Sequence, residues 1–132
     1  MEKNWKYKSL VNLQKMMDFV PNANPPTRLV RRCEELLQIP LNEYSVEDLR
    51  IMIGQEFGLE YLIPLAIEKL QDDLFAEGDY YPGDLLQVIL NTKRVFWEQH
   101  QPLYEEIENL IRSRRKRISI LGIPLGEFDN NI

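Results

Sequence analysis

The chain has 132 residues, with 16 lysines and arginines against 21 aspartates and glutamates, so its formal net charge is −5. A hydrophobic fraction of 44% and a charged fraction of 28% are ordinary for a globular protein and exclude intrinsic disorder. The length predicts a single domain over residues 1–132 with a hydrophobic core of its own. The only cysteine, Cys33, excludes an intrachain disulfide and a thiolate zinc cluster.

Residues 1–10 are charged and lack the apolar segment of a signal peptide. Elsewhere, no stretch approaches the roughly 20 apolar residues of a membrane span. We therefore expect a soluble, cytoplasmic protein without a membrane partner. The acidic total also argues against a nucleic-acid partner, because phosphates require a basic surface.

The first predicted helix begins after Ser9, a residue type favoured at the N-cap. Its apolar positions are spaced three or four residues apart, as on one face of a helix. They are Leu10, Leu13 and Met17. Three prolines in residues 21–26 then predict a loop, because proline has no backbone N–H to donate.

A second helix is predicted between the N-cap candidate Thr27 and Pro40. It has an apolar stripe consisting of Leu29, Val30, Cys33, Leu36 and Leu37. On this stripe Cys33 is expected to be a buried small side chain and not a nucleophile. A third helix is predicted after Ser45, because Ser45 and Asp48 have the spacing of a capping box. Gly54 and Gly58 are expected to bracket its end.

Residues 60–71 are apolar nearly all round, which predicts a buried central helix. Pro64 must lie in its first turn or kink it. After a polar and aromatic loop, further helical segments are expected at residues 85–90, 95–97 and 102–117, and residues 118–125 make a weak strand candidate. The fold class is all-α, a single compact domain of six to seven helices packed around the central helix. Its core is expected at about residues 9–117, followed by a C-terminal tail, residues 118–132.

Charge is unevenly distributed along the chain. Residues 41–90 have two basic and eleven acidic side chains, net −9, whereas residues 1–40 are net +3 and residues 91–132 net +1. A basic run opposes this acidic block, formed by Arg112, Arg114, Arg115, Lys116 and Arg117. The run is predicted to lie at the C-terminal end of a helix, where the helix dipole favours basic side chains. Glu108 and Arg112 are also spaced for an i,i+4 ion pair.

No spacing in the chain predicts catalysis, so we expect a protein that is not an enzyme. His100 is the only histidine and has no partner histidine, and a surface position at a helix end accounts for it. The segment from Gly54 to Gly58 lacks the Gly-Lys-Ser/Thr ending of a phosphate loop. The chain also lacks the Glu-x-x-His of di-iron bundles. No metal and no cofactor are therefore expected.

The segment from residue 56 to residue 84 interleaves carboxylates with aromatic side chains. Tyrosine suits interfaces because it combines an apolar face with a hydrogen-bonding tip, and surrounding carboxylates steer a basic partner. The candidate partner-binding residues are Glu56, Glu60, Asp72, Asp73, Glu77, Asp79, Tyr80, Tyr81 and Asp84. The alternative is a solvated loop whose aromatic residues insert into the core.

Four stretches of the chain resemble the immunity proteins of bacterial contact-dependent growth inhibition (CDI) systems: Leu29–Cys33, Val46–Gln55, Gly58–Ala66 and Phe75–Leu86. The most distinctive are Glu-Asp-Leu-Arg-Ile-Met-Ile-Gly-Gln at residues 47–55 and Glu-Gly-Asp-Tyr-Tyr-Pro-Gly-Asp-Leu-Leu at residues 77–86. The resemblance covers roughly residues 9–111.

The resemblance implies a small, cytosolic, non-catalytic protein that neutralises the C-terminal toxin domain of a cognate surface-displayed effector. Such toxins are often nucleases with basic substrate-binding surfaces, which suit an acidic inhibitor. The resemblance identifies no binding site, because the recognition residues vary between pairs of toxin and immunity protein.

Two other hypotheses remain open from the sequence. One is an acidic helical adaptor for another protein, which would not be encoded directly after a large secreted effector as an immunity protein would. The other is an RNA-binding protein that uses the basic run at residues 112–117.

Overall fold

The computed structural model describes residues 3–129, which form eight α-helices and three short 3-10 helices and contain no strand. The prediction of an all-α fold is confirmed. In chain order the elements are η1 (Trp5–Tyr7), α1 (Leu10–Leu13), α2 (Arg28–Leu37), η2 (Leu41–Glu43), α3 (Val46–Gly54), α4 (Leu59–Asp72), α5 (Asp84–Leu90), α6 (Arg94–Gln99), α7 (Gln101–Arg112), α8 (Arg115–Ile120) and η3 (Gly126–Phe128).

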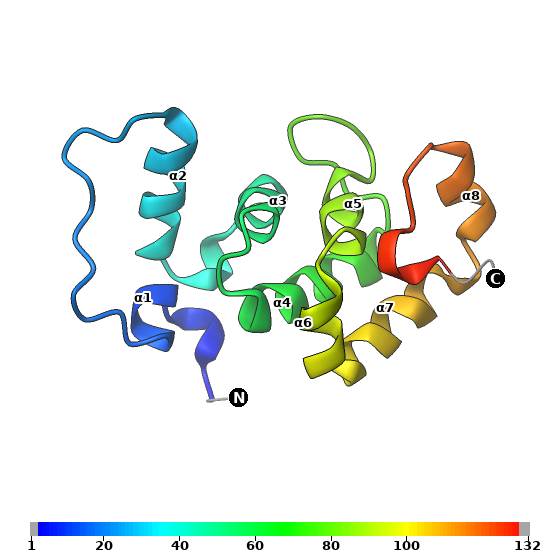
Figure 1. Ribbon diagram of the computed structural model, residues 1–132, viewed down its shortest axis with the longest axis horizontal. Coiled ribbons are helices and arrows are strands. Elements are labelled where there is room, and N and C mark those ends of the chain that lie inside the picture. The colour runs from blue at the N-terminus through cyan, green and yellow to red at the C-terminus, as the bar shows by residue number, and fades with distance from the viewer. Residues whose placement is uncertain (1–2, 130–132) are drawn as a thin grey trace.

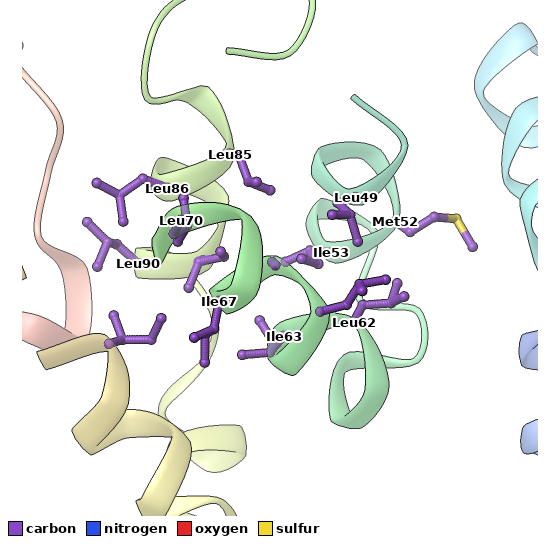
Figure 2. Packing of buried hydrophobic residues seen from close by; sticks show 14 of the residues in the cluster. Leu49, Met52, Ile53, Leu62, Ile63, Ile67, Leu70, Leu85, Leu86 and Leu90 are labelled. Carbon is purple, nitrogen blue, oxygen red and sulfur yellow. The ribbon is translucent and has the colours of Figure 1, made fainter. Parts of the chain in front are cut away.

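Helix α4 lies at the centre of the molecule, and α3, α5 and α7 pack directly against it. Figure 1 shows α1 and α2 at one end of the long axis and α8 at the other, with the loop between α4 and α5 projecting beyond α5. Figure 2 shows side chains of α3, α4 and α5 meeting in one apolar cluster.

The wide apolar face of α4 explains its central position, as predicted. Six of its side chains are buried: Leu62, Ile63, Leu65, Ala66, Ile67 and Leu70. Because they cover more than half of the helix circumference, no single neighbouring helix can cover them, and several elements must. The remaining strip is polar and exposed, and it consists of Glu60, Glu68, Lys69, Gln71 and Asp72. Pro64 lies in the second turn, inside the helix and beyond the first turn, so the helix there lacks one backbone donor.

The predicted N-caps of α2 and α3 are confirmed. The Thr27 hydroxyl accepts the Val30 N–H at 3.0 Å. At α3 the capping box is complete: the Ser45 hydroxyl accepts the Asp48 N–H at 3.1 Å, and the Asp48 carboxylate accepts the Ser45 N–H at 3.0 Å. Gly58 begins α4 and does not end α3: it has φ +52°, and a Cβ there would lie 2.6 Å from Leu10 Cδ2.

The first helix is shorter than predicted. It ends at Leu13, because Lys15 has a left-handed φ of 52° and turns the chain away. Met17, predicted on the apolar face, is instead 91% exposed. The chain then runs through the proline-containing segment to α2 without regular structure.

The predicted long helix over residues 102–117 is also wrong. It divides into α7 and α8 at Ser113 and Arg114, and Arg114 is not helical, with φ −118° and ψ 12°. The strand candidate at residues 118–125 therefore falls on the end of α8 and the turn after it. The alternation there arises because α8 and this turn each bury one isoleucine, Ile118 and Ile123.

The segment after residue 117 is part of the core and is not a tail. Phe128 is fully buried, stacks on Tyr104 with ring centroids 4.3 Å apart, and meets Trp97 edge to face at 5.1 Å. The Trp97 indole N–H donates to the Thr92 carbonyl at 3.1 Å, and the Arg115 guanidinium donates to the Phe128 carbonyl at 3.1 Å. The predicted boundary at residue 117 thus falls inside the packed domain. The last three residues of the predicted tail, 130–132, lie outside the described residues.

We expect the substitution Phe128→Ala to lower the free energy of unfolding by about 3–5 kcal/mol, because it leaves a cavity beside Trp97 and Tyr104. Urea denaturation followed by helical circular dichroism measures this. Val95→Ala on α6 is the control, because Val95 is 56% exposed and its truncation should change stability little. Equal effects of the two substitutions would contradict a core role for residue 128.

Candidate functional site

The nine candidate residues fall into two groups at opposite ends of α4. Glu56 and Glu60 lie at its beginning, whereas the other seven lie at or after its end. Glu60 and Asp72 are twelve residues apart on the helix, which is about 18 Å along its axis. The structure therefore brings together only the second group, on the loop of residues 73–83 that we call the acidic loop.

The first group faces other elements. The Glu56 carboxylate lies 3.3 Å from the Lys93 ammonium, next to the start of α6. The Glu60 carboxylate accepts a hydrogen bond from the Gln14 side chain at 3.4 Å. Glu56 and Glu60 are exposed, but they are not continuous with the acidic loop.

Asp84 corrects the sequence prediction of a surface residue. Its side chain is only 2% exposed, because it points back into the acidic loop. One carboxylate oxygen accepts the Gly78 N–H at 2.7 Å and the other accepts the Tyr80 N–H at 3.1 Å. Asp84 therefore shapes the loop from within and is not available to a partner.

Two residues of α3 complete the support of the loop. The Glu47 carboxylate accepts the Asp79 N–H at 2.9 Å. Arg50 holds that same carboxylate with two hydrogen bonds, of 2.6 Å from Nε and 2.5 Å from a terminal nitrogen. The Arg50 guanidinium also lies 3.9 Å from Asp84 and 4.5 Å from the centre of the Tyr80 ring. One arginine thus contacts both carboxylates that bind the loop and the aromatic ring at its tip.

The sequence pattern does not reveal this support. Glu47 and Arg50 have the i,i+3 spacing of a helix ion pair, which is common and gives no hint of a loop more than 25 residues away. The network lowers the pKa of Glu47 below its usual value of 4.5, mainly through the hydrogen bonds from Arg50 and also through the Asp79 N–H. Glu47 is therefore ionised at neutral pH.

Backbone contacts close the base of the acidic loop. The Gly83 N–H donates to the Phe75 carbonyl at 3.0 Å, and Glu77 and Pro82 form an isolated antiparallel bridge. Gly83 has φ +91°, a conformation that favours glycine. The loop is therefore a compact turn with internal hydrogen bonds, projecting beyond α5 in Figure 1.

The tip of the loop presents charge and aromatic surface together. Tyr80 is 69% exposed and Tyr81 is 41% exposed, and the Tyr81 hydroxyl donates to the Gln87 side chain. Glu77 and Asp79 are exposed on the same loop, and Asp72 and Asp73 are exposed at the end of α4 that leads into it. The ion pairs Arg32–Asp48, Lys6–Glu68 and Lys93–Glu56 offset part of the −9 block elsewhere. The excess negative charge is thus concentrated at the acidic loop.

The remaining chemical candidates have structural roles. Cys33 is buried, as predicted. His100 ends α6 half-buried, stacked on Phe96 with ring centroids 4.2 Å apart, and its Nδ1 lies 2.9 Å from the Phe96 carbonyl oxygen. Among residues 3–129, no three His, Cys, Asp or Glu side chains group as metal ligands would. Within the same residues, no helix has the length and apolar character needed to cross a membrane.

The lowered pKa of Glu47 predicts a pH dependence of stability. A carboxyl group whose pKa is lower in the folded state stabilises the fold above its unfolded pKa, and this stabilisation is lost as pH falls through the folded value. We therefore expect Glu47→Gln to lower the free energy of unfolding at pH 7 more than at pH 3.

Urea titrations of both proteins at the two pH values measure this difference. Glu43→Gln, which changes an exposed carboxylate near the start of the same helix, is the control and should have little effect at either pH. If Glu47→Gln lowers the free energy of unfolding by the same amount at pH 7 and pH 3, the charge of Glu47 does not stabilise the loop.

Comparison with known proteins identifies the family. A family model described as CDI immunity proteins matches residues 17–107, more than half of the chain. The matched region contains α2 to α6, the first half of α7 and the whole acidic loop. No curated protein and no solved structure matches the chain. The extent of the family match shows that the chain belongs to the family of CDI immunity proteins.

Proposed function

We propose that the protein neutralises one cognate CDI toxin by stoichiometric binding, with the acidic loop at the centre of the interface. Family membership supports an immunity role against such a toxin and is the observation that carries the proposal. The contact residues we propose are the exposed members of the loop and the end of α4: Asp72, Asp73, Glu77, Asp79, Tyr80 and Tyr81. No catalytic step is involved.

The order of the loop favours tight binding. Association costs conformational entropy when a flexible loop must become fixed, and a loop that is already fixed avoids most of that cost. Here Glu47 and Asp84 bind three backbone N–H groups of the loop before any partner arrives. Tyr80 and Tyr81 then provide rigid aromatic anchors, the residue type that contributes most to binding at many interfaces.

The charge of the loop favours one kind of toxin. The exposed carboxylates of the loop and of the end of α4 attract a basic surface and speed association. Nucleases need a basic surface to bind the phosphate backbone of their substrates. We therefore propose a nuclease toxin whose substrate-binding surface is covered by the acidic loop, with neutralisation in the cytoplasm. Covering that surface excludes the substrate.

The adaptor hypothesis uses the same surface with another partner. Genetic context separates the two: the proposal requires a large secreted effector encoded directly upstream, with a C-terminal domain that this protein binds. Loss of protection from that toxin on deletion of the gene is the most informative single result.

Charge reversal tests the loop. The loop-reversal variant combines Asp72→Lys, Asp73→Lys and Asp79→Lys. We expect it to raise the dissociation constant for the toxin domain of the upstream effector at least about tenfold, because like charges then face each other. Isothermal titration calorimetry measures binding, and circular dichroism should show unchanged helicity.

The matched control variant combines Glu98→Lys, Glu105→Lys and Glu106→Lys, three exposed carboxylates on α6 and α7. It changes the net charge equally, so its toxin affinity should remain near that of the wild type. If the loop-reversal variant binds the toxin as well as this control does, the interface lies elsewhere.

Truncation of an aromatic side chain separates the anchors from the charges. We expect Tyr80→Ala to weaken toxin binding by about 2 kcal/mol or more, mainly through faster dissociation. Tyr7→Ala is a close control, because Tyr7 has the same 69% exposure as Tyr80 but lies on η1. Surface plasmon resonance gives both rates. Equal dissociation rates for the two variants would remove Tyr80 from the interface.

A further inference from the structure

The helix dipole explains only part of the basic run at residues 112–117. Arg112 lies in the last turn of α7, where the dipole favours it as predicted, and Arg117 lies in the last turn of α8. Arg115 and Lys116 instead begin α8, at the positive end of the helix. Arg115 has a structural role, because it holds Glu108 at 2.6 Å and the Phe128 carbonyl at 3.1 Å. The dipole does not account for Arg114 or Lys116.

These cations form an exposed surface with apolar side chains beside it. We call it the basic patch, and it consists of Arg112, Arg114, Lys116, Arg117, Ile120 and Leu121, all exposed. Its four cations make no ion pair with a carboxylate of the described residues. Ile120 is 67% exposed and Leu121 is 38% exposed, so the two form a small apolar surface next to the cations.

The basic patch is adjacent to the acidic loop. The Arg114 guanidinium lies 5.1 Å from the centre of the Phe75 ring, at the base of the loop. Ile123, just after α8, packs so closely on Gly83 that a Cβ there would lie 2.6 Å from Ile123 Cδ1. In Figure 1 the loop rises above α5, and α8 lies beside α5 at the end of the long axis. The basic patch and the acidic loop therefore adjoin at the base of the loop.

We propose that this surface binds a second copy of the chain in a two-fold dimer. In such a dimer the basic patch of each copy contacts the acidic loop of the other, so one contact is made twice and the assembly closes. Charge complementarity selects this occupant, because each copy supplies both signs in equal number. The exposed apolar side chains also match, with Ile120 and Leu121 available to cover Tyr80 and Tyr81.

RNA, the other candidate for a basic run, fits this surface less well. The adjacent carboxylates repel a phosphate backbone, whereas a second copy turns them into favourable contacts. The apolar side chains of the patch are aliphatic, and single-stranded nucleic acid is bound by stacking on aromatic ones. The acidic total of the chain disfavours RNA further.

Dimerisation also has a consequence for toxin binding. The dimer covers the acidic loop, so self-association and the toxin interaction proposed above exclude each other. This step rests on the proposed function, whereas the dimer itself does not. We therefore expect the toxin-free protein to be a dimer and the toxin-bound protein to form a 1:1 complex.

A charge exchange tests the dimer in the absence of toxin. The patch-reversal variant combines Arg112→Glu, Lys116→Glu and Arg117→Glu and leaves Arg114 and Arg115 in place. In sedimentation equilibrium we expect wild-type protein to self-associate, and the loop-reversal and patch-reversal variants each to have a dimer dissociation constant at least about tenfold higher. An equimolar mixture of the two variants should form a heterodimer, because both contacts again join opposite charges.

The control variant with lysines at residues 98, 105 and 106 removes the effect of net charge. It should itself dimerise like the wild type, and it should not form the heterodimer with the patch-reversal variant, although their net charges attract. Wild-type protein that stays monomeric into the high micromolar range would overturn the inference. So would a heterodimer formed equally well by the control variant.

Two further readouts keep this inference separate from the proposed function. The patch-reversal variant should bind the toxin domain with at least wild-type affinity, because its acidic loop is intact and no longer covered. A patch-reversal variant that loses toxin binding would show that the toxin occupies the patch, against a dimer there. Binding of a short single-stranded RNA by monomeric wild-type protein, lost on patch reversal and steeply dependent on salt, would assign the patch to RNA.

Discussion

The constraint on which the rest of the structure depends is the burial of more than half of the circumference of α4. One neighbouring helix cannot cover so wide an apolar face. It is therefore covered by several short elements, α3 and α5 on one side and α7 on another. Each of these elements exposes its own opposite face and its end loops.

The acidic loop is a consequence of this arrangement. Because α3 and α5 both pack on α4, they also pack on each other, which brings the first turn of α3 next to the loop that leads into α5. Glu47 and Asp84, one from each helix, can then bind backbone N–H groups of the same loop. Arg50 lies between the two carboxylates and offsets part of their repulsion. Burying two carboxylates without such a cation would cost more than the loop contacts return.

Local patterns in the sequence were sufficient for the helices but not for the distant contacts. The caps at Thr27 and Ser45 and the burial of α4 follow from neighbouring residues and were predicted correctly. Phe128 and Asp84 were not placed correctly, because their burial depends on partners distant in the chain or on a loop conformation. Lys15 and Arg114, where the helices end earlier than predicted, are residue types with no strong preference for ending a helix, so tertiary packing decided the boundaries.

The positions of the charged side chains indicate more about function than the net charge does. Seven of the eleven carboxylates in the acidic block either contact basic or amide side chains or bind the loop from within, so the total of −5 says little about function. The other four are Glu43 on η2 and the exposed Asp72, Glu77 and Asp79, which lie on the acidic loop or at the end of α4 that leads into it. Stability alone does not require like charges to cluster in this way. The acidic loop and the basic patch are both best explained by partners of opposite charge, and their adjacency allows the same surface to accept two partners in turn.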